Sequence, residues 1–317
     1  MREPTLLLAL ALLPLTAQGQ SPVPQVRTQA PGFYRFVVGD IEVTALNDGV
    51  ISYRTAELLP TLSAEEIRTK LLQMGLTDPV DMSYNAYLVN TGDRLVLIDT
   101  GTGGKLDDSP YFKGGGRLLA NLRAAGYQPE QVQEIYITHL GPDHVGGLVQ
   151  GSDRVFPNAT LRASTREVAI FMQKQSPEVE AKDWRLKFWR GLFDPYINAG
   201  KFHPFEQDTI LVPGVRSLFT YGHTRGHTSY VVESKGQTLL ILGDLMLVGA
   251  IQFEQPSLET PYDVDRPAGA AARERVMQMA SRNDWWIAGA HLSFPGIGRV
   301  KPSSTGYRFL PVNYRLP

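Results

Sequence analysis

The chain has 317 residues, of which 43% are hydrophobic and 20% are charged, so it is long enough to bury a large core. Its formal net charge is -1 and its basic residues form no runs, which argues against nucleic acid as a partner. There is no cysteine, so disulfides and thiolate metal sites are excluded, and any metal ion must be bound by histidine, aspartate or glutamate.

The N-terminus has the pattern of a secretory signal peptide. Arg2 precedes an apolar stretch from Leu6 to Leu15, and Ala17-Gln18-Gly19 forms a small-x-small exit. The stretch is too short to cross a bilayer, and a buried N-terminal helix is the alternative interpretation. We expect an exported protein, periplasmic or secreted, whose mature form is not in a membrane. Its expected parts are a signal peptide (1–19), a tail (20–32) and a single domain (33–317).

In the first half of the chain, strand patterns alternate with helix patterns. Two strands joined at Gly39-Asp40 come first, followed by a helix that begins with the capping box of Ser63 and Glu66 and ends at Gly75. Further elements are expected in this order: a hairpin turning at 91–93, a helix over 117–126, a strand over 134–139, and helices over 166–173 and 183–193.

The second half repeats this plan, which predicts two β-rich halves with helices outside them. Its expected elements are a strand ending at His223, a hairpin turning at Lys235-Gly236, a helix over 268–281 and a strand over 285–291. Alternating strands and helices of this kind favour two packed sheets covered by helices.

Five of the predicted strands run into a residue that can bind a metal ion. These are Asp99, His139, His223, Asp244 and His291, and Asp143 and His144 follow His139 closely. Because loops that leave one edge of a sheet can converge, we expect these side chains to lie together. A single aspartate or histidine at a strand end is usually structural, but a set of this size predicts a metal centre.

The motifs around these residues resemble, in the same order, those of the metallo-β-lactamase-fold hydrolases. The segments are LIDTG (97–101), THLGPDHVGG (138–147), GHTRGH (222–227), LGD (242–244) and AH (290–291). Segments such as NAYLVNTG, GHTSYVVES and HLSFPGIG resemble the methyl parathion hydrolase group, over most of residues 30–315. The resemblance implies an α+β fold, a four-layer αββα sandwich, and a hydrolase with one or two divalent ions. Zinc is expected, with manganese, iron and cobalt as alternatives, and a homodimer is one expected state.

The same resemblance implies roles for the candidate residues. One ion would be bound by His139, residue 141 and His223, and the other by Asp143, His144 and His291, with Asp244 bridging the two. Asp143 and Asp244 are the candidate catalytic residues, beside a metal-bound hydroxide as nucleophile. Asp99 is expected to orient a ligand histidine. His227 is a similar supporting residue, a residue of the substrate pocket, or a histidine packed beneath the hairpin.

Gly141 departs from the family pattern, which has histidine at this position. Glycine offers no side-chain donor, and Pro142 after it holds its backbone extended. We expect the second site to fill first, and the missing imidazole to leave room for a water molecule or part of a substrate. Three interpretations remain: a binuclear enzyme with one labile ion, a mononuclear enzyme, or a catalytically impaired protein that only binds metal or ligand.

The resemblance also implies an aromatic substrate pocket formed by Tyr111, Phe171 and Phe188. The alternative for Phe171 and Phe188 is a place in the core on a helix face. The expected substrates are small molecules: neutral aromatic esters, lactones or phosphotriesters. Hydrolysis of β-lactams is an alternative, for which Lys105 or Lys113 would bind the substrate carboxylate.

Overall fold

The computed structural model describes residues 23–104 and 114–314. Residues 31–317 form one compact unit, and residues 1–30 form a separate one, whose described part contains neither helix nor strand. The expected signal peptide lies outside the described residues. In the parts of the chain that are described, no helix combines the length and apolar character needed to span a bilayer.

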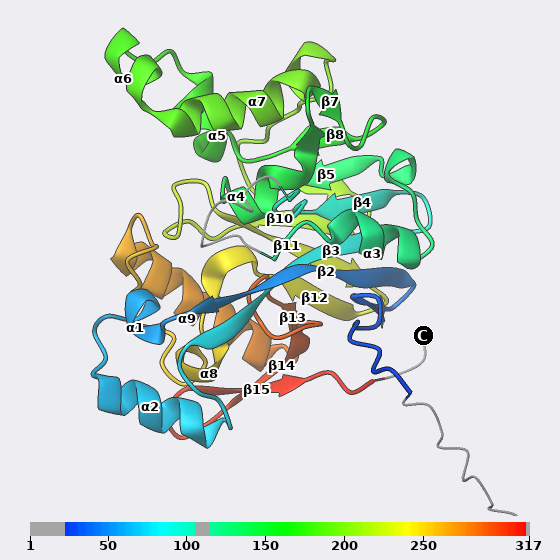
Figure 1. The fold of residues 1–317 in the computed structure, drawn as a ribbon. Helices are drawn as coiled ribbons and strands as arrows, with labels where there is room; N and C mark the ends of the chain where they lie inside the picture. Colours follow the sequence, from blue (N-terminus) through cyan, green and yellow to red (C-terminus); the bar gives the residue numbers. More distant parts are fainter. Residues whose placement is uncertain (1–22, 105–113, 315–317) are drawn as a thin grey trace, which may run out of the picture. The chain divides into compact units, whose positions relative to one another are not determined.

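The larger unit is built on two mixed β-sheets (Figure 1). The first sheet contains, in spatial order, β1 (Phe33–Val38), β2 (Ile41–Tyr53), β3 (Val80–Asn90), β4 (Leu95–Ile98), β5 (Glu134–Tyr136) and β8 (Thr160–Arg162). The second contains β15 (Tyr307–Pro311), β14 (Ile297–Pro302), β13 (Trp286–Ala288), β12 (Gln237–Ile241), β11 (Thr228–Ser234), β10 (Val215–Phe219) and β9 (Ile210–Val212). A small separate ribbon is formed by β6 (Val149–Gln150) and β7 (Asp153–Arg154).

The connecting segments contain both long and very short helices. They are α1 (Thr55–Leu58), α2 (Ala64–Gln73), α3 (Leu118–Ala124), α4 (Pro142–Val145), α5 (Thr165–Met172), α6 (Pro177–Lys182), α7 (Trp184–Asn198), α8 (Gly249–Gln252) and α9 (Arg266–Arg282). Short 3₁₀ turns cover Pro129–Gln131, Gly146–Leu148 and Gly243–Leu245. The capping box predicted at Ser63 and Glu66 is confirmed, since each side chain accepts a hydrogen bond from the other residue's backbone.

Three apolar clusters divide the structure into four layers. Val89 of β3 and Ile241 of β12 belong to a cluster between the two sheets. Leu88, the neighbour of Val89, faces the other way into a cluster with α3 and α7, and Leu240 faces a cluster with α9. Successive strand residues point to opposite faces, so each sheet buries one face against the other sheet and one against helices. The predicted four-layer αββα sandwich is confirmed.

Parallel strand pairs bring the metal-binding motifs to one edge of the sandwich. β4 is parallel to β5, and β12 is parallel to β13, so the carboxyl ends of each pair lie side by side. The strands are shorter than predicted: β5 ends at Tyr136, β10 at Phe219 and β13 at Ala288, each before the histidine that follows. The candidate ligands therefore lie on the loops after the strands, a common position for binding sites in α/β sheets.

The predicted end of the helix over 183–193 was wrong. The helix α7 continues through Pro195 to Asn198, because Phe193 and Tyr196 on its inner face are buried in the cluster beneath the first sheet. Tertiary packing thus outweighs the helix-breaking tendency of the proline.

Candidate metal centre

Asp99 anchors the first metal-binding loop. Its backbone has a φ of 61°, a left-handed conformation that is uncommon for residues other than glycine. Its Oδ1 accepts a hydrogen bond from the Thr138 backbone N–H at 2.8 Å, and its Oδ2 accepts one from the Thr138 hydroxyl at 2.8 Å. The same Oδ2 lies 2.8 Å from Nδ1 of His144. A proton on Nδ1 is therefore directed at Asp99, which leaves Nε2 of His144 as the lone-pair donor toward the centre.

The loop after β5 places its donors through one turn of helix. Gly141 is the N-cap of α4, Pro142 is its first residue, and the Gly141 carbonyl accepts from the backbone N–H groups of His144 at 2.9 Å and Val145 at 3.1 Å. That turn presents Asp143 and His144 together. Because the Gly141 carbonyl is already bonded to α4, it is not available as a metal ligand in place of the missing imidazole.

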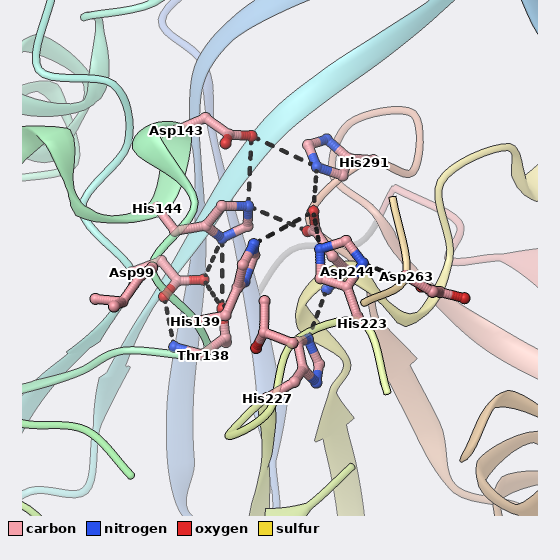
Figure 2. A network of polar contacts seen from close by, with 12 residues as sticks. Asp99, Thr138, His139, Asp143, His144, His223, His227, Asp244, Asp263 and His291 are labelled. Atoms are coloured by element: carbon pink, nitrogen blue, oxygen red, sulfur yellow. Dashed lines mark hydrogen bonds and ion pairs between the residues drawn. The ribbon is translucent and has the colours of Figure 1, made fainter. Parts of the chain in front are cut away.

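Asp244 lies at the middle of the donor set (Figure 2). Its Oδ2 is 3.0 Å from Nε2 of His291, 3.5 Å from Nε2 of His223 and 3.6 Å from Nε2 of His139. Its Oδ1 is 3.1 Å from Nε2 of His144. The carboxylate thus faces four imidazoles from three loops, since His139 and His144 both follow β5.

Asp143 completes the set on the side of His291. Its Oδ2 lies 3.3 Å from Nε2 of His144 and 3.5 Å from Nε2 of His291. The structure therefore brings together the residues that the sequence pattern nominated as ligands: His139, Asp143, His144, His223, Asp244 and His291.

These residues fit a divalent metal ion. Nε2 of His144 and Oδ1 of Asp244 are buried, and neither forms a hydrogen bond of acceptable geometry with any described residue. Buried polar atoms in proteins almost always have a partner, so two unpartnered atoms only 3.1 Å apart indicate a group that contacts both. Two triplets of donor atoms, from His139, His144 and Asp244 and from Asp143, His144 and His291, each lie within 4.8 Å of one another. Imidazole and carboxylate donors are those that zinc prefers.

Burial and neighbouring charges shift the pKa values of the candidate metal ligands. Burial alone would raise the pKa of Asp244, but His144, His291 and His139 outweigh it and hold that pKa well below its usual range. Burial would likewise lower the pKa of His144, yet the carboxylates of Asp244, Asp143 and Asp99 raise it well above its ordinary value. For His139, burial and the neighbouring His144 lower the pKa, which favours the neutral imidazole that binds metal.

A second aspartate, Asp263, supports His223 and was not predicted from the sequence. Oδ1 of Asp263 lies 3.2 Å from Nδ1 of His223, and its Oδ2 accepts from the guanidinium of Arg273 at 2.9 Å. Arg273 is fully buried and also donates to the carbonyls of Pro256 and Leu258. Neither residue belongs to a recognisable motif, so only the folded chain reveals the connection.

His227 lies behind the donor set rather than in it. Its Nε2 accepts a hydrogen bond from the Asp244 backbone N–H at 3.1 Å, and its Nδ1 lies 2.9 Å from the Thr220 hydroxyl. Burial and the neighbouring His223 lower the pKa of His227 to about 3, so the ring is neutral. With Nε2 accepting, Nδ1 carries the proton and donates to Thr220, and the ring holds the backbone of Asp244 in place.

The His139 ring occupies part of the space beside Gly141. A Cβ atom at this position would lie 2.5 Å from Nε2 of His139 and 2.8 Å from Cδ2 of His144. The His139 ring, which stands 4.1 Å from the His144 ring, extends into the region that the missing side chain would enter. Gly141 nevertheless lines a cavity, so the expected room for a water molecule or part of a substrate stays a prediction.

A cavity of about 730 Å³ opens above the donors and is lined by Asp143, Asp244 and His291 among others. Aromatic and aliphatic side chains make up much of its wall. They include Tyr53, Met82, Tyr84, Trp189, Leu247 and Tyr262.

The structure corrects the predicted aromatic pocket. Phe171 is 3% exposed and packs against Phe193, with ring centroids 5.0 Å apart, and it does not line the cavity. Phe188 packs against the same core cluster. On each helix the neighbouring residue faces the cavity instead, Ile170 on α5 and Trp189 on α7, because consecutive helical residues differ by about 100° in direction. Tyr111 lies outside the described residues.

Comparison with known proteins places this geometry in a family. The family model described as the metallo-beta-lactamase superfamily matches residues 80–291. An N-acyl homoserine lactonase from Bacillus cereus is 28% identical over 170 residues, which cover 49% of this chain and 60% of that protein. A probable metallo-hydrolase, Mb2322c of Mycobacterium bovis, is 27% identical over 185 residues, covering 50% of this chain and 54% of that protein. The chain thus spans little more than half the length of these curated relatives.

Two solved structures share the fold over nearly the whole chain. The hydrolase AbOPH, of the beta lactamase superfamily, superposes with a TM-score of 0.82 at 31% identity and covers 91% of this chain and 100% of its own. AidC, a dizinc quorum-quenching lactonase in complex with an N-acyl homoserine product, superposes with a TM-score of 0.78 at 25% identity, covering 90% and 99%. The chain therefore belongs to the metallo-beta-lactamase superfamily.

Proposed function

We propose that the protein is a metal-dependent hydrolase of lactones and aryl esters. The observation that carries this proposal is the set of six histidine and aspartate donors, five of which line a cavity, with two of the buried donor atoms lacking partners. The lactonases among its relatives support a lactone as the reacting group. Phosphotriesters, suggested by the resemblance to methyl parathion hydrolases, are the second candidate substrates.

The chain offers two overlapping sets of ligands. His139, His223 and Asp244 would hold one divalent ion, zinc in the first instance, and Asp143, His144, His291 and Asp244 would hold the other. Because Gly141 contributes neither a side chain nor a free carbonyl to the first set, we propose that the second set fills first. Bound at this position, a divalent ion would polarise the substrate carbonyl and activate a water molecule.

The protein's own side chains orient these ligands. Asp99 fixes the tautomer of His144, Asp263 binds Nδ1 of His223, and the Ser83 carbonyl lies 3.0 Å from Nδ1 of His291. With each Nδ1 proton engaged, each Nε2 presents its lone pair to the cavity floor.

We propose Tyr84 as the proton donor beside the site. It lines the cavity, and its ring lies edge-on to the His291 ring at 5.8 Å. Burial and the neighbouring carboxylate of Asp143 raise the pKa of Tyr84 above its ordinary value, so its hydroxyl stays protonated. We assign it the stabilisation of the oxyanion that forms when the carbonyl is attacked.

The proposal is tested by metal analysis beside a hydrolysis screen. The protein is purified without chelators, and zinc per chain is measured together with turnover of N-hexanoyl homoserine lactone, dihydrocoumarin, p-nitrophenyl acetate and methyl paraoxon. We expect at least one zinc and turnover of lactone and ester. No turnover after zinc or manganese is added back would favour a protein that only binds metal or ligand, and turnover of a β-lactam alone would favour that alternative.

Export is a separate proposal that rests on the signal pattern of residues 1–19. Expression with the native N-terminus in a bacterial host, followed by N-terminal sequencing, tests it. Recovery of the uncut chain in the cytoplasm would contradict export.

A further inference from the structure

Two arginines on the wall of the cavity point to a subsite for an acidic group. Arg166 lies in the first turn of α5, Arg225 lies in the loop between β10 and β11, and both line the cavity above the metal ligands. We infer that this pair binds a carboxylate at the far end of the substrate, so that the preferred substrate is a lactone or ester with an acidic arm. The inference rests on the proposed hydrolase function and narrows its substrate class.

A buried glutamate holds the two arginines on adjoining backbone. Oε2 of Glu167 accepts hydrogen bonds from the Thr224 hydroxyl at 2.6 Å and from the Gly226 backbone N–H at 2.9 Å. A Cβ at Gly226 would lie 2.3 Å from the Glu167 nitrogen, so the loop touches the start of α5 directly. Arg225 is the residue between the two donors, and Arg166 precedes the acceptor. The contacts that join the loop to the helix therefore bring the backbone of Arg166 and Arg225 close together, and both residues line the cavity.

Neither arginine is neutralised within residues 23–104 and 114–314. The Arg166 guanidinium lies over the Tyr221 ring at 5.0 Å and the Phe219 ring at 5.8 Å, and its side chain makes no hydrogen bond or ion pair with the described residues. Stacking on a ring holds a guanidinium while its N–H edge remains available. The Arg225 side chain likewise has no hydrogen-bonding or ionic partner among the described residues.

The acidic residues of the cavity wall are already paired with groups other than Arg166 and Arg225. Asp143 and Asp244 face the imidazoles of the metal centre. Glu167 accepts three hydrogen bonds, the third from the Leu140 backbone N–H at 2.9 Å. A substrate carboxylate would pair with the guanidinium groups of Arg166 and Arg225, since guanidinium and carboxylate form paired, charge-assisted hydrogen bonds.

A third cavity arginine provides an internal contrast. Arg185 also lines the cavity, but its Nε and Nη2 donate to the two oxygens of Asp183 at 2.9 and 2.7 Å. Its charge is already paired, so it should contribute little to the binding of an acidic arm. The cavity wall also includes apolar surface, from Ile170 and Val264 among others, which suits an alkyl chain.

The test compares two lactones that differ only at the end of the acyl arm. N-adipoyl homoserine lactone ends in a carboxylate where N-hexanoyl homoserine lactone ends in a methyl group. We measure the ratio of their kcat/KM values for the wild-type protein and for Arg166→Gln, Arg225→Gln and the control Arg185→Gln. The wild type should favour the acidic lactone, and each of the first two variants should lower the ratio by about tenfold. Arg185→Gln should leave it unchanged.

A binding measurement separates the subsite from the proposed reaction. The two ring-opened products are titrated into the same proteins by calorimetry, which needs no turnover. The adipoyl product carries a second carboxylate at the end of its acyl arm. Tighter binding of this product than of the hexanoyl product, lost in Arg166→Gln and Arg225→Gln, would support the subsite even if neither lactone were hydrolysed. In that case only the proposed hydrolase function would fail. Hydrolysis of both lactones at a ratio that neither variant changes, with equal product binding, would overturn the subsite and leave the hydrolase proposal standing.

Discussion

Nε2 of His139 lies 2.5 Å from the position that a Cβ atom at Gly141 would occupy. The His139 ring cannot retreat freely, because the rings of His144 and His223 stand 4.1 and 4.8 Å from it and its Nδ1 lies 3.1 Å from the Thr138 hydroxyl. Glycine at position 141 therefore removes a metal ligand and also leaves room for the rings of His139 and His144 in their present positions.

We expect Gly141→Ala to lower zinc affinity by at least about tenfold, because the methyl group displaces His139 from its donor position. Competitive titration against a chelator measures the affinity. Gly191→Ala is the matched control, since a Cβ at Gly191 meets nothing within 4 Å. Gly141→His brings the same clash together with a new nitrogen donor, so it should bind more zinc than Gly141→Ala. Unchanged affinity in Gly141→Ala would show that the His139 ring moves at no cost.

Replacing Asp99 by asparagine tests the tautomer of His144. The amide can place its NH₂ group against Nδ1, which would direct the imidazole proton to Nε2, where the metal ligand is needed. We expect zinc affinity to fall by about 10- to 100-fold. The folded protein should keep its circular dichroism spectrum. Wild-type affinity in Asp99→Asn would mean that the carboxylate does not set the ring orientation.

Asp263→Asn should damage stability as well as metal binding. Asp263 pairs with Arg273, which is fully buried, so the substitution leaves a buried cation without its counter-charge. We expect the free energy of unfolding to fall by about 3 kcal/mol, and zinc affinity to fall because His223 loses its partner. Denaturant unfolding of the metal-free protein measures the first effect separately from the second. Asp284→Asn, at an exposed ion pair, should change neither quantity much.

Tyr84→Phe removes a hydroxyl from the cavity wall and leaves the ring. If the hydroxyl stabilises the oxyanion, kcat should fall by about 100-fold while zinc content and KM change little. Tyr262→Phe, on the same wall, is the control for loss of a cavity hydroxyl. A rise in KM with unchanged kcat would instead assign Tyr84 to substrate binding.

Sequence periodicity was enough to predict two packed sheets covered by helices, because the alternation of side chains depends only on neighbouring residues. Alternation in segments such as Leu95–Ile98 sends one residue to each face, and both faces of that strand are buried, as the structure confirms. The capping box at Ser63 was equally readable, since it depends on residues three positions apart. The end of α7 at Asn198 could not be predicted from the sequence, because it depends on the long-range packing of Tyr196.

The sequence by itself determined which donors converge, because six histidines and aspartates follow strands whose carboxyl ends share one edge. Only the tertiary structure decided which residues support these donors through hydrogen bonds and which residues line the cavity around them. Asp263, Glu167 and the pair Arg166 and Arg225 act across contacts between segments far apart in the chain. The place of Phe171 in the core rather than the cavity depended on the packing of α5 against α7, where Phe171 contacts Phe193. Short-range patterns specify elements and their faces, whereas the partners of a buried polar group are chosen by the packing of the whole chain.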